Sequence, residues 1–143
     1  MKTFYEGHDA EYKKRFAAGS QGWDSSDNGY EIHQSILTKI LAAGHAPKTG
    51  KLLELGCGAG NIGLWFAGLG YSVSGIDIAP TAVELAQKRA IESGADASFC
   101  VGNVLDLEPY EEDEFDFVFL IILLVLTLQL VGTIHKVFSF FIT

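Results

Sequence analysis

The chain has 143 residues, of which 48% are hydrophobic and 20% charged, a composition typical of one folded domain rather than of a disordered chain. Its formal net charge of −8 argues against non-specific binding to nucleic acid, which requires a basic surface. The two cysteines show neither metal-type spacing nor a disulfide framework, and the N-terminus is too polar for a signal peptide, so we expect no metal site and a cytoplasmic location.

The first third of the chain is expected to form helices joined by a loop. Residues 9–18 are a candidate for a short charged helix, and residues 19–29 are rich in turn-forming residues and contain Trp23. Apolar residues then recur at helical spacing over residues 30–43. We expect residues 1–47 to form a helical cap ahead of the main fold.

The most informative stretch predicts a strand, a glycine turn, a helix and a second strand. An apolar strand over residues 51–56 leads into a helical pattern over residues 60–69, and a second strand over residues 71–76 ends at Asp77. The turn after the first strand contains three glycines: Gly56, Gly58 and Gly60. Glycines let the backbone approach a ligand closely, and a carboxylate at the tip of the second strand accepts hydrogen bonds from ribose hydroxyls. This unit predicts binding of an adenosine-containing cofactor.

Strands and helices continue to alternate further along the chain. Residues 80–93 have a helical pattern, with Pro80 suited to the first turn and Gly94 suited to the end of the helix. Further strands are expected over residues 97–101 and 115–120. The alternation predicts an α/β fold, Rossmann-like, with a parallel sheet and helices on both faces.

Four segments of this core carry a family resemblance. They are Glu-Leu-Gly-Cys-Gly-Ala-Gly at 54–60, Asp77 with Ile-Ala-Pro at 78–80, Val-Gly-Asn-Val-Leu-Asp-Leu at 101–107, and Phe-Asp-Phe-Val-Phe at 115–119. In this order and spacing they resemble the motifs of the class I S-adenosylmethionine-dependent methyltransferases. The resemblance covers residues 48–119, the expected core. It implies S-adenosyl-L-methionine as the cofactor and methyl transfer as the reaction, and it leaves the catalytic residues unknown.

The resemblance also implies which residues bind the cofactor. These are Glu54, Gly56, Cys57, Gly58, Gly60, Asp77, Ile78, Gly102, Asn103 and Val104. Glu54 either faces the sulfonium end of the cofactor or orients a nearby loop. Asn103 stands where the family often has an aspartate facing the adenine amino group, and its amide oxygen can accept the same hydrogen bond. Val104 would offer its backbone N–H to the adenine ring.

The segment from Arg15 to Asp24 is similar to the N-terminal segment of small-molecule methyltransferases of the thiopurine and tellurite-resistance type. In those enzymes an aromatic residue lies over the cofactor, so the resemblance makes Trp23 a further candidate for the cofactor site, with Tyr30 beside it. The alternative is that Trp23 only packs the loop onto the domain. The resemblance favours a small-molecule acceptor over a protein or a nucleic acid, without indicating the acceptor atom.

A dinucleotide-binding domain is the competing interpretation of the glycine turn. Residues 58–63 fit the pattern G-x-G-x-x-G of NAD-binding domains, and Asp77 lies at about the expected distance. Glu54 argues against it, because an acid two residues before the first glycine suits a cationic ligand better than a pyrophosphate. We therefore favour the methyltransferase interpretation.

The tail, residues 120–143, departs from the family pattern. Residues 117–134 form an uncharged stretch of 18 residues, which meets the length threshold for a membrane-spanning helix. Three interpretations remain open: a truncation or frameshift, a membrane anchor, and a buried element that completes the sheet. The first is favoured because the change falls abruptly within an expected strand. We thus expect a methyltransferase core that is incomplete at its C-terminus and lacks the full acceptor site; the alternative is a non-catalytic, membrane-associated fragment.

Overall fold

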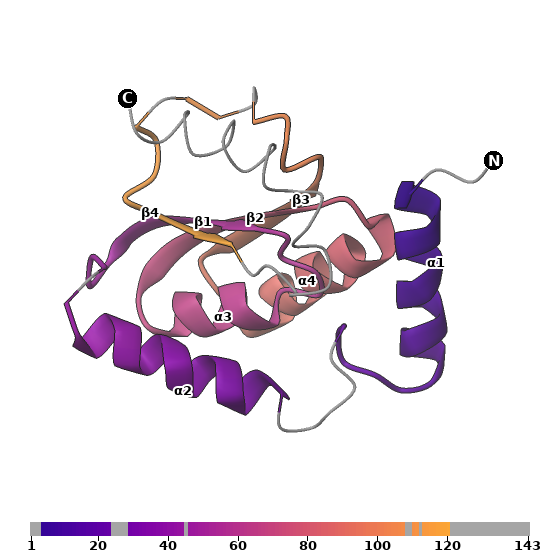
Figure 1. The fold of residues 1–143 in the computed structure, drawn as a ribbon, viewed down its shortest axis with the longest axis horizontal. Helices are drawn as coiled ribbons and strands as arrows, with labels where there is room; N and C mark the ends of the chain where they lie inside the picture. Colours follow the sequence, from indigo (N-terminus) through magenta and orange to yellow (C-terminus); the bar gives the residue numbers. More distant parts are fainter. Residues whose placement is uncertain (1–3, 24–28, 45, 108–109, 112, 121–143) are drawn as a thin grey trace.

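A computed structural model describes residues 4–23, 29–44, 46–107, 110–111 and 113–120 (Figure 1). The elements in these residues are α1 (Phe4–Ala17), α2 (Gly29–Ala42), β1 (Gly50–Leu55), α3 (Asn61–Gly68), β2 (Tyr71–Asp77), α4 (Pro80–Ser93), β3 (Ala97–Val101) and β4 (Phe117–Leu120). Residues 121–143 lie outside the described residues, so the interpretations of the tail stay predictions.

The four strands form one parallel sheet in the order β3-β2-β1-β4. The register places Leu52 of β1 between Val73 of β2 and Phe117 of β4. Parallel neighbours need a crossover connection, and α3 supplies it between β1 and β2, as α4 does between β2 and β3. The predicted Rossmann-like α/β fold is confirmed.

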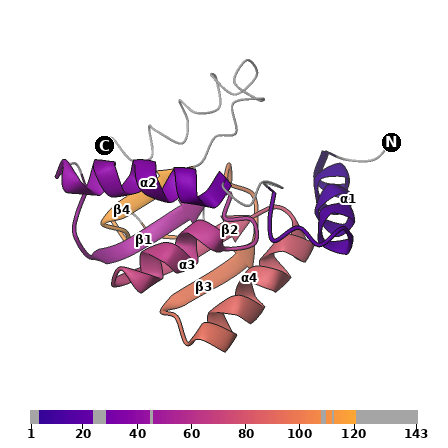
Figure 2. The same cartoon turned by 90° about the horizontal axis from the view of Figure 1, so that it is seen from below.

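Helices α2, α3 and α4 lie together on one face of the sheet (Figures 1 and 2). Phe66 of α3 is fully buried there, with edge-to-face contacts to Tyr71, Phe117 and Phe119. Burying a side chain of this size stabilises a fold by about 1.5–3 kcal/mol. Phe66 therefore anchors α3 to β2 and β4, and with α3 the turn that precedes it.

The other face of the sheet is covered differently within the described part of the chain. Leu53, Leu55 and Ile76 are buried on this face, and Leu107 packs against them from the segment between β3 and β4. Figure 1 shows that segment on the side of the sheet opposite to α3 and α4. The helices that we expected on this face are not among the described residues.

The observed elements follow the predicted ones closely except at two ends. Helix α1 begins at Phe4, five residues before the expected start. Strand β4 begins at Phe117 instead of residue 115, because Asp116 is used to anchor the neighbouring strand: its carboxylate accepts a hydrogen bond from the N–H of Lys51 at 2.8 Å. The bounds of α4 and β3 are those expected from the sequence.

Helix α1 stands against the start of α4 (Figure 1). Pro80 occupies the first turn of α4, and the preceding Ala79 has no side chain that could cap the helix. Asp9 of α1 supplies the acceptor instead, because its Oδ1 accepts a hydrogen bond from the N–H of Thr81 at 2.8 Å. This hydrogen bond between Thr81 and Asp9 therefore docks α1 onto the core beside the end of β2.

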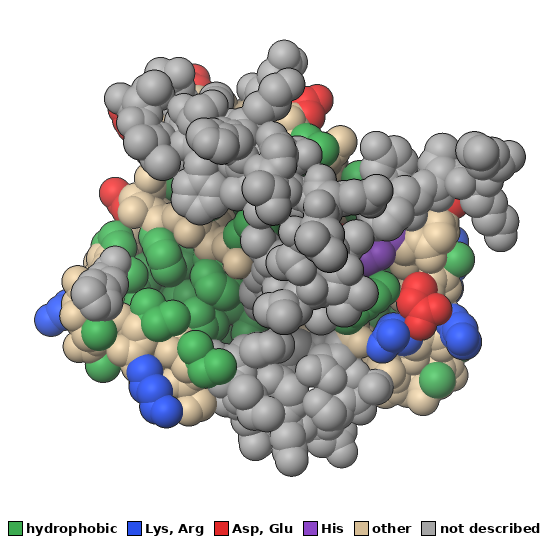
Figure 3. Space-filling view, in the orientation of Figure 1, with side chains coloured by type: hydrophobic (Ala, Val, Ile, Leu, Met, Phe, Trp, Pro, Cys, Tyr) green, Lys and Arg blue, Asp and Glu red, His purple; other side chains and the backbone are tan. Residues whose placement is uncertain are grey.

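Part of the apolar surface remains exposed. Ile36 and Ile40 of α2 leave 51% and 43% of their surface accessible. Figure 3 shows hydrophobic side chains gathered over α2 and α3 on the face that it presents. Among the described residues, no helix combines the length and the apolar character that crossing a membrane requires.

Candidate functional site

The predicted site residues gather at one edge of the sheet, where β1, β2 and β3 end. The loops that leave these strands are hydrogen-bonded to one another: Gly56 donates to the carbonyl of Ile76 at 2.8 Å, and Gly102 donates to the carbonyl of Asp77 at 2.9 Å. In open parallel sheets, ligands bind in the crevice outside the carboxyl ends of the strands. The structure thus brings three predicted segments together at the edge that this rule indicates.

The three glycines of the turn have left-handed backbone angles but different surroundings. Their φ values are 76° at Gly56, 51° at Gly58 and 79° at Gly60. Apart from its chain neighbours, no described residue has an atom within 4 Å of the position that a Cβ on Gly56 would take, so its exposed backbone is open to a ligand. A Cβ on Gly60 would lie 2.9 Å from the Cβ of Ala86 on α4. Gly56 therefore suits ligand approach, whereas Gly60 is required by helix packing.

Asp77 connects the glycine turn to the end of β2. One of its carboxylate oxygens accepts the N–H of Gly58 at 2.8 Å, and the other accepts the N–H of Ala79 at 2.9 Å. The side chain is buried, at 5% exposure. A carboxylate offers about four acceptor positions, so these two bonds leave capacity for two hydroxyl donors. The vicinal hydroxyls of a ribose match that capacity.

Glu54 lies within β1 and is buried behind the ligand edge. Its side chain is 1% exposed, it accepts a hydrogen bond from the N–H of Gly63 in the first turn of α3, and its Oε2 is buried without a partner among the described residues. Burial, together with the nearby charge of Asp77, raises the pKa of Glu54 to about 8. The carboxyl of Glu54 is therefore mostly protonated near neutral pH. Contact between Glu54 and a cofactor stays a prediction.

Cys57 and Ile78 occupy the loops of the same edge. Cys57 donates its backbone N–H to Ile76 at 3.0 Å, while its side chain is buried in the cluster formed by Val83, Ala86 and Phe99. Burial raises the pKa of the Cys57 thiol, so it stays protonated. Only the backbone of Cys57 thus belongs to the edge, and half-buried Ile78 follows Asp77 in the loop before α4.

The loop after β3 contributes backbone groups and the side-chain amide of Asn103 to this edge. A Cβ on Gly102 would lie 2.5 Å from the Cδ1 of Ile76, so a larger residue here would require the side chain of Ile76 to shift. The amide oxygen of Asn103 accepts the N–H of Leu105 at 3.0 Å, which fixes the side chain in a local turn and uses one of its two acceptor positions. The side chain of Val104 packs against the buried cluster of Leu53, Leu55, Ile76 and Leu107.

Tyr12 is a site residue that the sequence analysis did not identify. It is 4% exposed, and a Cβ on Gly58 would lie 2.6 Å from its hydroxyl oxygen. Its ring also meets that of Trp23 edge to face, with centroids 5.1 Å apart. The apolar pair Tyr12 and Phe16, four residues apart on a predicted helix, was a signal that this helix has a buried side.

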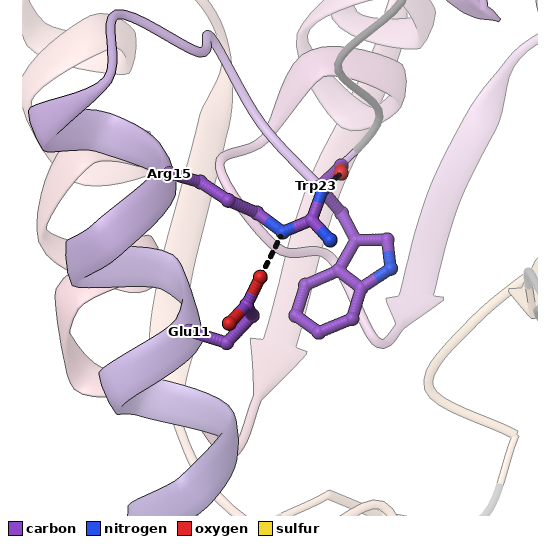
Figure 4. A network of polar contacts seen from close by, with 3 residues as sticks. All are labelled: Glu11, Arg15 and Trp23. Atoms are coloured by element: carbon purple, nitrogen blue, oxygen red, sulfur yellow. Dashed lines mark hydrogen bonds and ion pairs between the residues drawn. The ribbon is translucent and has the colours of Figure 1, made fainter.

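Trp23 is therefore placed next to the glycine turn through Tyr12. Its ring stacks on that of His8 with centroids 4.5 Å apart, and the guanidinium of Arg15 lies 4.6 Å from the centroid of the indole ring (Figure 4). This position is compatible with both interpretations of Trp23, because the ring packs the loop onto α1 and also lies near the ligand edge. Its contact with a cofactor stays a prediction.

The arrangement fits the nucleoside part of S-adenosylmethionine on three observations. The backbone at Gly56 is open, and Asp77 retains acceptor capacity for two hydroxyls. The loop after β3 lies next to Asp77, because the N–H of Gly102 donates to the carbonyl of Asp77. None of these three features is specific to the binding of a dinucleotide's phosphates.

Comparison with known proteins gives the same picture. A family model described as a methyltransferase domain matches residues 52–139. A ubiquinone biosynthesis O-methyltransferase of Xanthomonas axonopodis pv. citri (strain 306) is 30% identical over 113 residues, which cover 78% of this chain and 47% of that protein. The chain thus spans about half the length of the curated relatives that it matches.

Two solved structures share the fold. The PH0226 protein of Pyrococcus horikoshii OT3 has a TM-score of 0.62 at 27% identity, covering 80% of this chain and 53% of that one. A TehB-like SAM-dependent methyltransferase of Corynebacterium glutamicum ATCC 13032 has a TM-score of 0.50 at 25% identity, covering 82% of this chain and 54% of that one. Because the family model covers more than half of the chain and the glycine turn and Asp77 stand at the expected edge, the chain belongs to the class I S-adenosylmethionine-dependent methyltransferases.

Proposed function

We propose that the chain binds S-adenosylmethionine at the carboxyl edge of β1, β2 and β3, and that it acts in the transfer of a methyl group to a small molecule in the cytoplasm. The observation that supports this most strongly is the geometry of Asp77. Its carboxylate holds the glycine turn through Gly58 and keeps acceptor capacity for two ribose hydroxyls at the end of β2.

The residues of the edge would hold the cofactor, which supplies an already activated methyl group. Asp77 would accept the ribose hydroxyls, and the open backbone at Gly56 would let the ligand lie against the turn. The second acceptor position of the Asn103 amide would take the adenine amino group. Tyr12, which lies beside Gly58, and Trp23, which contacts Tyr12, would exclude water from the reacting end of the site.

The acceptor is the finer part of the proposal. The curated relatives are named as O-methyltransferases of ubiquinone biosynthesis, and the solved relative of Corynebacterium is described as TehB-like. By this likeness we propose a hydroxyl oxygen of a small molecule as the acceptor atom. The catalytic residues stay unassigned, because in this family the acceptor contacts come in large part from elements beyond β4.

Equilibrium binding tests the cofactor part of the proposal. S-adenosylhomocysteine, the demethylated product form, is titrated calorimetrically into the chain and into Asp77→Asn, with NAD as the comparison ligand. Asp96→Asn is the matched control, since Asp96 is exposed and lies outside the edge. We expect the parent and the control to bind S-adenosylhomocysteine alike, and Asp77→Asn to bind it about ten- to a hundredfold more weakly, because a charge-assisted bond is lost.

Two outcomes would contradict the proposal. One is tighter binding of NAD than of S-adenosylhomocysteine by the parent, which would restore the dinucleotide interpretation. The other is unchanged affinity in Asp77→Asn, which would place the ligand away from this edge. Thermal unfolding of each variant shows whether a lost signal reflects a lost site or a lost fold.

A further inference from the structure

Arg89 of α4 joins two parts of the chain that lie far apart in the sequence. Its Nη1 donates to the carbonyl of Ala59 in the glycine turn at 3.0 Å and to Oδ1 of Asn61 at 3.1 Å. The same guanidinium reaches Gln21, donating to its carbonyl at 3.0 Å and to its Oε1 at 2.6 Å. Asn61 adds a third bond, from its Nδ2 to the carbonyl of Gln21 at 3.1 Å.

A second arginine holds the other end of the same short segment, residues 20–23. Arg15 of α1 donates to the carbonyl of Trp23 and lies against the indole ring, while Glu11 accepts from its Nε at 3.0 Å (Figure 4). The N–H of Ser20 bonds to the carbonyl of Arg15 at 3.0 Å. The segment is thus held between α1 and the glycine turn, by one arginine at each end.

Residues 20–23 are also connected to the cofactor edge by packing. Trp23 contacts Tyr12, and the hydroxyl of Tyr12 stands over Gly58, which donates to Asp77. Arg89 also contacts this turn, through its hydrogen bond to the carbonyl of Ala59. A movement of the glycine turn on ligand binding would therefore be transmitted to residues 20–23 by two sets of contacts, the packing of Tyr12 against Trp23 and the hydrogen bonds of Arg89.

The chemistry of the network requires an arginine. Its acceptors are amide oxygens of three residues on two separate segments, Gln21 on one and Ala59 with Asn61 on the other, and the planar guanidinium presents several N–H donors in fixed directions. A lysine ammonium at the same place would be a single flexible point of charge. Exposed single ion pairs contribute little, but a charged donor shared among several acceptors on different loops can fix their relative positions.

We propose that Arg89 is a positioning residue that ties the docking of residues 20–23 to the glycine turn, so that cofactor binding and docking of this segment strengthen each other. The inference rests on the proposed function for the coupling to the cofactor. Because such coupling is reciprocal, weakening the Arg89 network must both loosen Trp23 and lower the affinity for the cofactor.

Trp23 provides the readout. The chain contains two tryptophans, so Trp65→Phe leaves Trp23 as the single one; Trp65 packs edge to face on Phe66, where a phenylalanine is a mild change. In this background, quenching of Trp23 by acrylamide is measured with and without S-adenosylhomocysteine for the parent, for Arg89→Gln and for Arg89→Lys. Lys88→Gln is the matched control, because its side chain is 67% exposed on the same helix.

We expect Arg89→Gln to raise the quenching of Trp23 without ligand and to weaken S-adenosylhomocysteine binding about tenfold, with partial recovery in Arg89→Lys. Ligand should protect Trp23 in the parent and in Lys88→Gln, and less in Arg89→Gln. Should Arg89→Gln fail to fold, Gln21→Ala removes the Oε1 acceptor from the loop side, and the same changes are expected at smaller size.

The inference is overturned if the quenching of Trp23 is the same in Arg89→Gln and in Lys88→Gln, or if affinity falls while Trp23 is unaffected. A parent that folds but does not bind S-adenosylhomocysteine would contradict the proposed function. In that case the ligand-free comparison still decides whether Arg89 holds residues 20–23: an increase in Arg89→Gln supports it, and no increase overturns it.

Discussion

Glu54 keeps its proton in the folded chain well above the pH at which an ordinary glutamic acid loses it. Burial beneath α3, with the nearby charge of Asp77, raises its pKa from 4.5 to about 8, and the bond from Gly63 only partly opposes this. In the unfolded chain the carboxyl ionises near 4.5, so between these values the folded state binds more protons. The stabilising contribution of Glu54 is therefore complete below about pH 4.5 and is lost as the pH rises toward 8.

Glu54→Gln should remove this pH dependence, because an amide of nearly the same shape does not titrate. We expect the free energy of unfolding of Glu54→Gln, relative to that of the parent, to rise by up to about 1.4 kcal/mol per pH unit between about pH 5 and pH 8. Urea unfolding at several pH values measures it, with exposed Glu84→Gln as the control. A difference that does not change with pH would show that Glu54 does not titrate in this range.

Gly58 and Gly56 have similar backbone angles but unequal space, which separates two causes of glycine preference. An alanine at either position bears the strain of a left-handed residue, about 1–2 kcal/mol. At Gly58 it also meets the hydroxyl of Tyr12 at 2.6 Å, whereas at Gly56 no described residue apart from its chain neighbours has an atom within 4 Å. We expect Gly58→Ala to lower the free energy of unfolding more than Gly56→Ala does, as measured by urea unfolding.

The same pair of positions tests the placement of Tyr12. In a Tyr12→Phe background the clashing oxygen is absent, so the additional cost of Gly58→Ala should shrink, while the cost of Gly56→Ala should not change. Equal costs of Gly58→Ala in both backgrounds would mean that Tyr12 does not lie over the glycine turn.

At the scale of the elements, the first helix is held on the core partly by the side chain of Asp9. Ala79 leaves the N-terminus of α4 without a cap of its own, and Asp9 of α1 accepts the N–H of Thr81 in its stead. Asp9→Ala should cost about 1 kcal/mol in the free energy of unfolding and should speed hydrogen exchange of α1 amides. Asp9→Asn, which keeps an acceptor oxygen, should lose less. Unchanged exchange in α1 after Asp9→Ala would contradict this docking.

The elements themselves were largely predictable from the sequence. Pro80 and Gly94 mark the ends of α4, and the apolar run before Gly56 marks β1, because helix ends and buried strands are decided by local chemistry. The start of α1 was missed, since residues 4–8 carry no amphipathic pattern and the helix is positioned by Asp9 and by Tyr12 against distant residues.

At the scale of the whole molecule, the sequence indicated the ligand edge but not what surrounds it. The glycines and Asp77 follow strands of a parallel sheet, so topology alone brings them together. The contacts of Arg89 with Gln21 join residues 68 apart, and the approach of Tyr12 to Gly58 depends on how α1 docks. Such side-chain contacts between separate segments have no periodic signature in the sequence.

The central claim is that the cofactor binds at the carboxyl edge of β1, β2 and β3. Titration of the isotope-labelled chain with S-adenosylhomocysteine, followed by amide resonances in a nitrogen–proton correlation spectrum, locates the ligand directly. The account predicts the largest shifts at the amides of Gly56, Gly58, Ala79 and Gly102, and little change along α2. Saturable shifts centred on α2, or a folded chain whose edge amides do not respond to the ligand, would contradict it.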